Sequence, residues 1–198
     1  MFLSMLEIDP RYTPAAMALS DPGYMHKMIQ EAFDTKRNEY NVLYRVLDYA
    51  ERKILYVQSK AVPNWMSLTR KGFNLIEVKN IQGLENTFKE ENCYRFAIKA
   101  FPSKKSSNVR EPLIDRESRM QWLQRESQKA GFDVVEVQER EQVRKTIHRI
   151  TGPFKLGGVV YEGVLKIKDK DAFVRAYQNG IGPEKAYGYG LLMLFGRA

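Results

Sequence analysis

The order of strand and helix patterns repeats once along the chain, and this repeat constrains the fold more than any other feature. In the first half, strand patterns alternate with helical ones in the order strand, helix, strand, strand, helix, strand, at residues 2–8, 21–33, 41–49, 53–59, 64–68 and 73–81. After the polar stretch "ENTFKEEN" the same order returns, at residues 93–101, 115–131, 132–150, 158–167, 169–180 and 189–196.

This order of elements is that of a ferredoxin-like βαββαβ unit. We therefore predict an α+β protein made of two tandem ferredoxin-like domains, residues 1–88 and 89–198. The two halves show no visible sequence repeat, so the duplication is inferred from the order of elements alone. A chain of 198 residues, 43% of them hydrophobic, is large enough to bury a core in each domain.

The first long helix carries start signals at its beginning. Asp21 is a typical N-cap residue, and Pro22 suits the first helical position. Helical spacing then places five apolar side chains on one face: Met25, Met28, Ile29, Ala32 and Phe33.

The distribution of charge indicates an anionic partner. The net charge is +8, and the first fifty residues hold five basic against seven acidic side chains, so the remainder carries +10. Nucleic acid is the first candidate partner, and an acidic membrane surface or a basic protein without a specific partner are the alternatives. The single cysteine, Cys93, excludes an internal disulfide and a cysteine-rich zinc site. We expect a reduced, cytoplasmic protein without a membrane span, because no apolar run approaches about 20 residues.

Histidine chemistry is restricted to two residues. His26 lies about one turn from the start of the first long helix, where the helix dipole favours the neutral ring and would let it exchange protons near neutral pH. A half-exposed surface histidine is the alternative interpretation. His148 stands in the basic segment "VRKTIHRI", where it would face either phosphate or solvent.

The sequence contains no regularly spaced set of carboxylates or histidines of the kind that a metal-dependent nuclease needs. We therefore expect no metal and no other cofactor. RNA offers a route without metal, because its own 2′-hydroxyl can attack the adjacent phosphate while the protein transfers protons and stabilises charge.

Two basic segments are candidate phosphate contacts. "PSKKSSNVR" is a loop-like segment that carries Lys104, Lys105 and Arg110, and "HRITGPFKLGG" joins two strands with Arg149 and Lys155 on its arms. The alternative for both is a solvated basic surface. Serine and glycine interleaved with the basic residues favour phosphate contact.

The stretch "GIGPEKAYGYGLLMLFG", residues 180–196, is unusually rich in glycine. A dinucleotide-binding fingerprint is disfavoured because no helix follows it. The aromatic residues also match the strand motif of RNA-recognition modules only weakly, since that motif belongs to an interior strand. We expect a backbone that passes close to RNA or to the helix of His26, with Lys185 directed at a phosphate.

Four stretches together resemble the CasE endoribonucleases of CRISPR type I-E systems, in the RAMP superfamily, over nearly the whole chain. They are the terminal "GIGPEKAYGYGLL" with its Lys185, "YEGVLKIKDKDAF", "YRFAIKAFPSKK" and "MQWLQRESQKAGFDV". The resemblance implies a protein that binds the CRISPR repeat stem-loop of precursor RNA. Such a protein cuts at the 3′ base of the stem without metal, leaves a 2′,3′-cyclic phosphate, and retains the mature guide RNA within the Cascade complex with its other subunits.

The resemblance also implies roles for individual residues. The family's catalytic histidine maps onto His26, seven residues before Phe33. The family's tyrosine commonly lies three residues before the histidine, where this chain has Gly23, with Tyr24 one step later. On a regular helix Tyr24 and His26 point about 200° apart, so Tyr24 assists only if the helix begins later than Asp21 indicates.

A basic hairpin in the second half is implied to enter the groove at the foot of the RNA stem, which opens at a helix end. Its candidate RNA contacts are Arg144, Lys145, His148, Arg149 and Lys155. Lys155 is also expected to stabilise charge at the cleaved phosphate, as is Lys185. Two alternatives remain open from the sequence: an RNA-binding subunit of the same fold without catalysis, and a basic RNA-binding protein unrelated to CRISPR.

Overall fold

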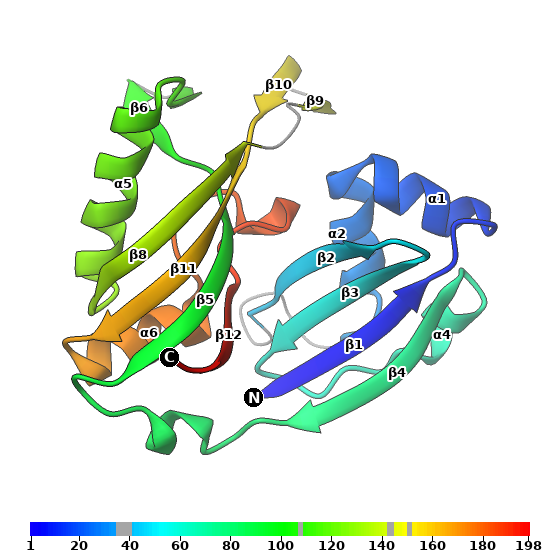
Figure 1. Cartoon of the computed structure of the whole chain (residues 1–198). Coiled ribbons are helices and arrows are strands. Elements are labelled where there is room, and N and C mark those ends of the chain that lie inside the picture. The colour runs from blue at the N-terminus through cyan, green and yellow to red at the C-terminus, as the bar shows by residue number, and fades with distance from the viewer. Residues whose placement is uncertain (35–40, 107–108, 142–144, 150–151) are drawn as a thin grey trace. The chain divides into compact units, whose positions relative to one another are not determined.

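The computed structural model describes residues 1–34, 41–106, 109–141, 145–149 and 152–198. They form two compact units (Figure 1). The first contains Met1–Leu84 together with Lys185–Gly188, and the second contains Glu85–Glu184 together with Tyr189–Ala198.

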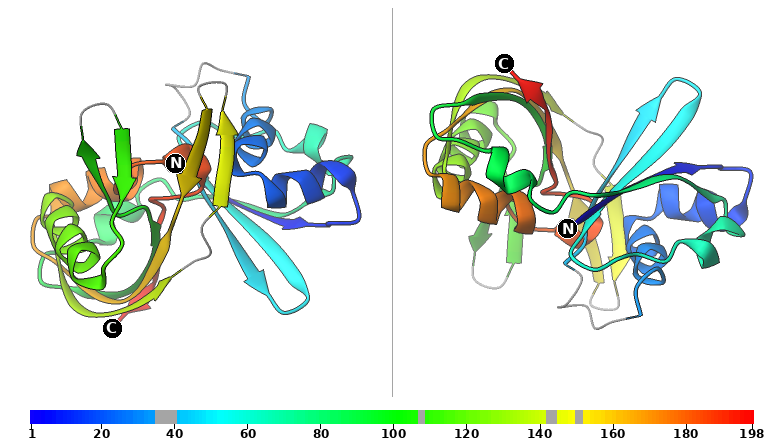
Figure 2. Two further views of the ribbon diagram at one scale, coloured as in Figure 1. Left: turned by 90° about the horizontal axis from the view of Figure 1, so that it is seen from above. Right: turned by 90° about the horizontal axis from the view of Figure 1, so that it is seen from below.

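The first unit is an antiparallel sheet with helices on one face. The strands are β1 (Phe2–Ile8), β2 (Leu43–Tyr49), β3 (Arg52–Ser59) and β4 (Phe73–Asn80), in the order β2-β3-β1-β4. The helices α1 (Thr13–Ser20), α2 (Pro22–Gln30) and α4 (Met66–Thr69) cover the same face (Figures 1 and 2). Their apolar side chains form one core with those of β1 and β3. The core also holds a buried polar contact, in which Trp65 Nε1 donates to Ser4 Oγ at 3.0 Å.

The second unit repeats this arrangement. Its sheet is formed by β5 (Cys93–Ala100), β8 (Phe132–Glu141), β11 (Val159–Ile167) and β12 (Leu192–Arg197), in the order β12-β5-β11-β8. Helices α5 (Arg116–Lys129) and α6 (Lys170–Asn179) pack on one face, around Trp122, Phe132 and Phe173. When the four main strands of each unit are numbered in chain order, both sheets have the same order: fourth, first, third, second. The predicted fold class, two tandem ferredoxin-like domains, is therefore confirmed.

Two additional hairpins belong to the second unit. β6 (Ser103–Ser106) pairs with β7 (Val109–Pro112), and β9 (Lys145–Arg149) pairs with β10 (Gly152–Leu156). The second hairpin is the predicted basic one. The first was expected to be a loop, because its serines and lysines show none of the apolar alternation that marks a strand.

The division of the chain differs in detail from the sequence prediction. The boundary was placed after residue 88, whereas the first unit ends at Leu84, just where the short 3₁₀ helix η1 (Leu84–Thr87) begins. Phe88 is buried in the core of the second unit, where it packs edge-to-face against Phe173. The 3₁₀ helix η2 (Lys185–Tyr187) was assigned to the second domain but belongs to the first unit.

A buried ion pair fixes α5 on the second sheet. Arg119 Nε lies 2.5 Å from Glu139 Oε1, and the two side chains are only 9% and 4% exposed. The Arg119 guanidinium also donates to the carbonyl oxygen of Ile114, and the Tyr161 hydroxyl donates to the Arg119 carbonyl at 3.1 Å. Burial, and then the nearby Glu139 carboxylate, raise the pKa of Tyr161 above its usual range, so this hydroxyl stays protonated and continues to donate.

Replacing Arg119 by Ala is expected to lower the free energy of unfolding by about 3–5 kcal/mol, because Glu139 is left as an unpaired buried charge. Urea denaturation measures this loss. The matched control is Arg116→Ala, an exposed arginine on the same helix, for which we expect a change within about 0.5 kcal/mol. Equal losses in the two variants would contradict the role of the buried pair.

An exposed carboxylate links the start of the second unit to the end of β11. Glu91 accepts hydrogen bonds from Lys166 and Lys168, each at 2.5 Å, and its backbone N–H donates to the Ile167 carbonyl. These two lysines lower the pKa of Glu91 to about 2, from an ordinary value of 4.5. A lowered pKa stabilises the folded state above the unfolded pKa, and this contribution is lost as the pH falls through the folded pKa.

Glu91→Gln is therefore expected to be less stable than the unmodified protein at pH 7, with a difference that shrinks between pH 4.5 and about 2. Denaturation midpoints measured at pH 7, 4.5 and 3 test the trend. In a background where Lys166 and Lys168 are both replaced by Met, the Glu91→Gln change is expected to have no further pH-dependent effect. A constant difference at all three pH values would refute the linkage.

Candidate catalytic site and nucleic-acid interface

His26 lies in the second turn of α2, whose start is fixed as the sequence predicted. The Asp21 carboxylate accepts a hydrogen bond from the Gly23 N–H at 2.7 Å, and Pro22 occupies the first turn. The helix buries Met25, Met28 and Ile29 in the core of the first unit. His26 lies at the edge of this apolar stripe and is half-buried.

Tyr44 on β2 joins His26 to the C-terminal part of the chain. Its ring stacks near the imidazole, with the two centroids 6.5 Å apart and the ring planes 16° from parallel. The Tyr44 side chain is buried, and its hydroxyl proton is shared between two acceptors, the carbonyl oxygen of Pro22 at 3.0 Å and that of Ala186 at 3.1 Å. One side chain thereby connects the first turn of α2, the imidazole and η2.

The glycines around η2 are explained by contacts with aromatic rings of the protein. Gly188 has φ +80°, and a Cβ there would lie 3.0 Å from Cε2 of Tyr44. Gly182 has φ +77°, and a Cβ there would lie 2.9 Å from Cζ2 of Trp122. Of the two expectations for this stretch, approach to the helix of His26 is the one that the structure matches. The conformation of the glycines therefore gives no reason to place Lys185 against RNA. The remaining support for a role of Lys185 is its position on η2, which Tyr44 links to α2.

Tyr24 does not share the face of His26. The helix begins at Pro22, so the later start that Tyr24 would need is not present. Its ring instead packs against the core of the first unit. The structure therefore argues against Tyr24 as an assistant in catalysis.

The predicted basic residues of "PSKKSSNVR" lie on the β6–β7 hairpin of the second unit. Lys104 pairs across the ribbon with Glu111, and their charged atoms lie 3.4 Å apart. Lys105 is exposed and stands directly opposite Arg110. Like charges in directly opposed positions destabilise a ribbon, so an anion bound between them would relieve the repulsion.

The second predicted basic group lies on the β9–β10 hairpin. In its register Arg149 pairs with Gly152, His148 with Pro153 and Lys155 with Thr146, while Lys145 pairs with Leu156. Arg144 lies outside the described residues.

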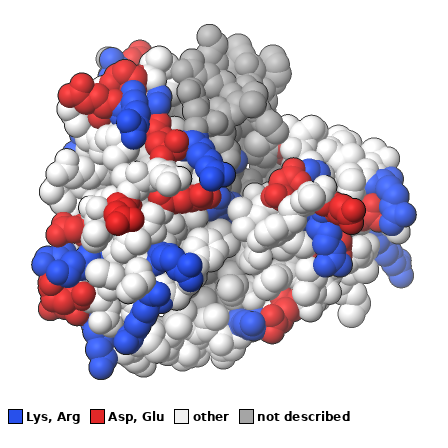
Figure 3. Space-filling model, in the orientation of Figure 1, with Lys and Arg blue, Asp and Glu red and all other residues white. Residues whose placement is uncertain are grey.

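Charges of both signs are interspersed on the face drawn in Figure 3, within the part of the chain that is described. Ion pairs between described residues, such as Arg52 with Glu7 and Lys53 with Asp48, offset part of the basic charge of the chain. The described part of this face therefore carries no broad basic patch.

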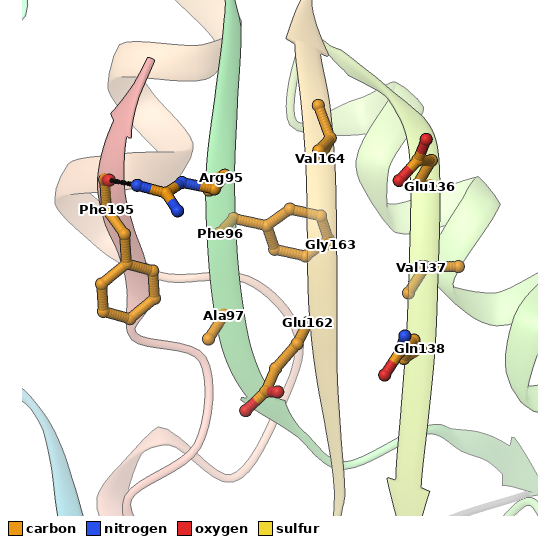
Figure 4. A pocket seen from close by; sticks show the side chains of 10 residues that line it. All are labelled: Arg95, Phe96, Ala97, Glu136, Val137, Gln138, Glu162, Gly163, Val164 and Phe195. Carbon is orange, nitrogen blue, oxygen red and sulfur yellow. Dashed lines mark hydrogen bonds between the residues drawn. The ribbon is translucent and has the colours of Figure 1, made fainter. Parts of the chain in front are cut away.

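A hollow lies on the second sheet (Figure 4). It is lined from all four strands, and its charged residues are Arg95, Glu136 and Glu162. Arg95 is already engaged, because its Nη2 donates to the Phe195 carbonyl at 3.2 Å. Two carboxylates beside one occupied arginine make this hollow a poor site for the phosphates of RNA.

Within the described ranges, no three His, Cys, Asp or Glu side chains gather in a way that would hold a metal ion. None of the helices in this part of the chain combines the length and the apolar character that crossing a membrane requires.

Comparison with known proteins identifies the family. Residues 1–195 match the model of the family described as CRISPR associated protein, and the chain belongs to that family. It is 25% identical to the CRISPR-associated endoribonuclease Cse3 of Thermus thermophilus, over 97% of this chain and 98% of that protein. It is 40% identical to the Cascade subunit CasE of Escherichia coli over a shorter region, 43% of this chain and 42% of the relative.

Solved structures agree with this assignment at the level of the fold. CRISPR endoribonuclease Cse3 bound to a 19-nucleotide RNA superposes with a TM-score of 0.89 and 23% identity, over 99% of this chain and 100% of the other. Cas6e of Escherichia coli superposes with a TM-score of 0.75 and 25% identity, over 98% of both chains.

Tyr44 was missed by the sequence analysis. It lies within an apolar strand pattern, and its partner Ala186 is 142 residues away along the chain. Apolar periodicity predicts that such a tyrosine is buried, but it does not indicate which distant backbone oxygen accepts a hydrogen bond from its hydroxyl.

Gly188→Ala is expected to be more destabilising than Gly196→Ala by at least about 1 kcal/mol. Both glycines have positive φ, +80° and +92°, so alanine is strained at both positions. An added Cβ meets the Tyr44 ring at position 188 and meets nothing within 4 Å at position 196. Chemical denaturation of the two variants isolates the contact with the Tyr44 ring. Equal losses of unfolding free energy in the two variants would show that the Tyr44 ring moves away from the added Cβ at no cost.

Proposed function

We propose that the chain is a metal-independent endoribonuclease that binds the CRISPR repeat stem-loop of precursor RNA and cleaves it at the 3′ base of the stem. The observation that carries the proposal is the attachment of His26, through Tyr44, to the C-terminal η2 segment in a chain of this family. The full-length relative from Thermus thermophilus is named an endoribonuclease, which supports the same activity here.

In the proposed reaction, the 2′-hydroxyl of the nucleotide before the cut attacks the adjacent phosphorus. A bond forms between O2′ and phosphorus, and the bond between phosphorus and the 5′-oxygen breaks, which leaves a 2′,3′-cyclic phosphate. The 2′-hydroxyl loses a proton and the leaving 5′-oxygen gains one. His26 performs one of these two transfers as general acid or base, because an imidazole exchanges protons near neutral pH.

The basic residues of the chain would hold the RNA. Phosphate contacts are assigned to Lys104, Lys105, Arg110, Arg144, Lys145, His148 and Arg149. The opposed pair of Lys105 and Arg110 supports this assignment, because a phosphate would offset their mutual repulsion. Lys155 and Lys185 are assigned to charge stabilisation at the scissile phosphate.

After cleavage the protein would retain the mature guide RNA and join the other subunits of a Cascade complex in the cytoplasm. The name of the Escherichia coli relative, a Cascade subunit, supports this assembly.

His26→Ala is expected to reduce the rate of cleavage of a repeat stem-loop by about 10²- to 10⁴-fold, with binding of the RNA retained, because proton transfer is lost while the phosphate contacts stay. Single-turnover assays in EDTA and a filter-binding assay measure the two quantities. Lys27→Ala, an exposed residue of the same helix, is the matched control and is expected to leave both unchanged.

The RNA provides an independent control. A 2′-deoxy substitution at the nucleotide before the cut removes the attacking hydroxyl and is expected to block cleavage without reducing binding. Tight binding with no cleavage by the unmodified protein would favour the RNA-binding subunit without catalysis. Equal binding to the repeat and to an unrelated stem of the same length would favour a basic RNA-binding protein outside CRISPR.

A further inference from the structure

The ring of Tyr187, the last residue of η2, covers Gly23 in the first turn of α2. A Cβ placed on Gly23 would lie 3.8 Å from Cε1 of Tyr187, an ordinary van der Waals contact. Both residues belong to the first unit, although they lie at opposite ends of the chain. The surface of the helix at Gly23, which has no side chain of its own, is thus covered by a phenol from elsewhere in the sequence.

This position is on the face of His26. Residues three apart on a helix differ by only about 60° in direction, so Gly23 and His26 share a face. Helical side chains also lean toward the N-terminus, so the imidazole extends over the turn that contains Gly23.

Tyr44 brings the two groups together from the other side. Its ring stacks with the imidazole, and its hydroxyl bonds the carbonyl oxygens of Pro22 and Ala186, the residues directly before Gly23 and Tyr187. The backbone that carries Tyr187 is therefore fixed at the turn over which His26 leans.

We propose that Tyr187 is a second catalytic residue beside His26, and that its hydroxyl donates a hydrogen bond to a non-bridging oxygen of the scissile phosphate. This inference rests on the proposed function. The bonds made and broken are those of the cleavage described above, and the Tyr187 hydroxyl keeps its proton throughout. Its contribution is to stabilise the charge that grows on the phosphate as O2′ attacks.

The test compares Tyr187→Phe with the unmodified protein in single-turnover cleavage of the repeat stem-loop. Phe keeps the ring over Gly23 and removes only the hydroxyl, so we expect a rate about 10²-fold lower with RNA affinity and unfolding midpoint unchanged. Tyr12→Phe, an exposed tyrosine of the same unit, is the matched control and is expected to cleave at the normal rate.

A relocated phenol tests position as well as chemistry. Gly23 has no positive φ, and with the ring of residue 187 removed the nearest group to an added Cβ is the Asp21 carboxylate, whose Oδ1 lies 3.2 Å away and has to shift by a few tenths of an ångström. We expect Tyr187→Ala to cleave more slowly than the unmodified protein. The double variant Gly23→Tyr with Tyr187→Ala is expected to cleave at least tenfold faster than Tyr187→Ala alone.

The outcomes separate this inference from the proposed function. If His26→Ala slows cleavage as expected but Tyr187→Phe cleaves normally, Tyr187 is only a packing residue and the inference fails. If His26→Ala cleaves at the undiminished rate, the role of His26 in the proposed function itself fails. A loss of RNA affinity in Tyr187→Phe equal to its loss of rate would also overturn the catalytic role, because it would make Tyr187 a ground-state contact.

Discussion

The buried contact of Tyr44 is the interaction on which the candidate site depends. The single hydroxyl proton is shared between two backbone carbonyl oxygens from segments far apart in sequence, and the ring that carries it stacks with the imidazole and lies against Gly188. The hydroxyl keeps the Pro22 carbonyl as an acceptor in any case, and its contact with the Ala186 carbonyl is an additional interaction that favours the arrangement in which η2 lies against α2. The orientation of His26 and the path of the C-terminal segment are therefore set by the same residue.

The fold was accessible from the sequence because apolar periodicity reports burial directly. The helix of His26 is an example: Asp21 and Pro22 mark its start, and Met25, Met28 and Ile29 mark the face that it buries. Element order then sufficed for the topology, since both halves alternate strands and helices in the same way. Helix α1 was overlooked because its eight residues carry only a weak apolar stripe. The β6–β7 ribbon was overlooked for a related reason, since Lys and Ser along it give no strand signal.

The candidate site was only partly accessible. His26 was found because the chain has just two histidines and because the residues around it resemble a known family. The tyrosine could not be chosen by proximity along the chain: Tyr24 is the neighbour in sequence, yet its ring joins the core, whereas Tyr44 and Tyr187 reach the helix through tertiary contacts. Glycine richness was read as close approach of the backbone to RNA or to the helix of His26, while at positions 182 and 188 the close neighbours are aromatic rings of the protein itself.

The membership of Lys185–Gly188 in the first unit makes that unit discontinuous in sequence. During synthesis the first eighty-four residues leave the ribosome long before the segment that completes the surroundings of α2. The site around His26 is thus assembled only after residues 185–188 have been synthesised. A nascent or prematurely terminated chain carries the histidine without its surroundings, so the two halves of this duplicated fold are not interchangeable modules.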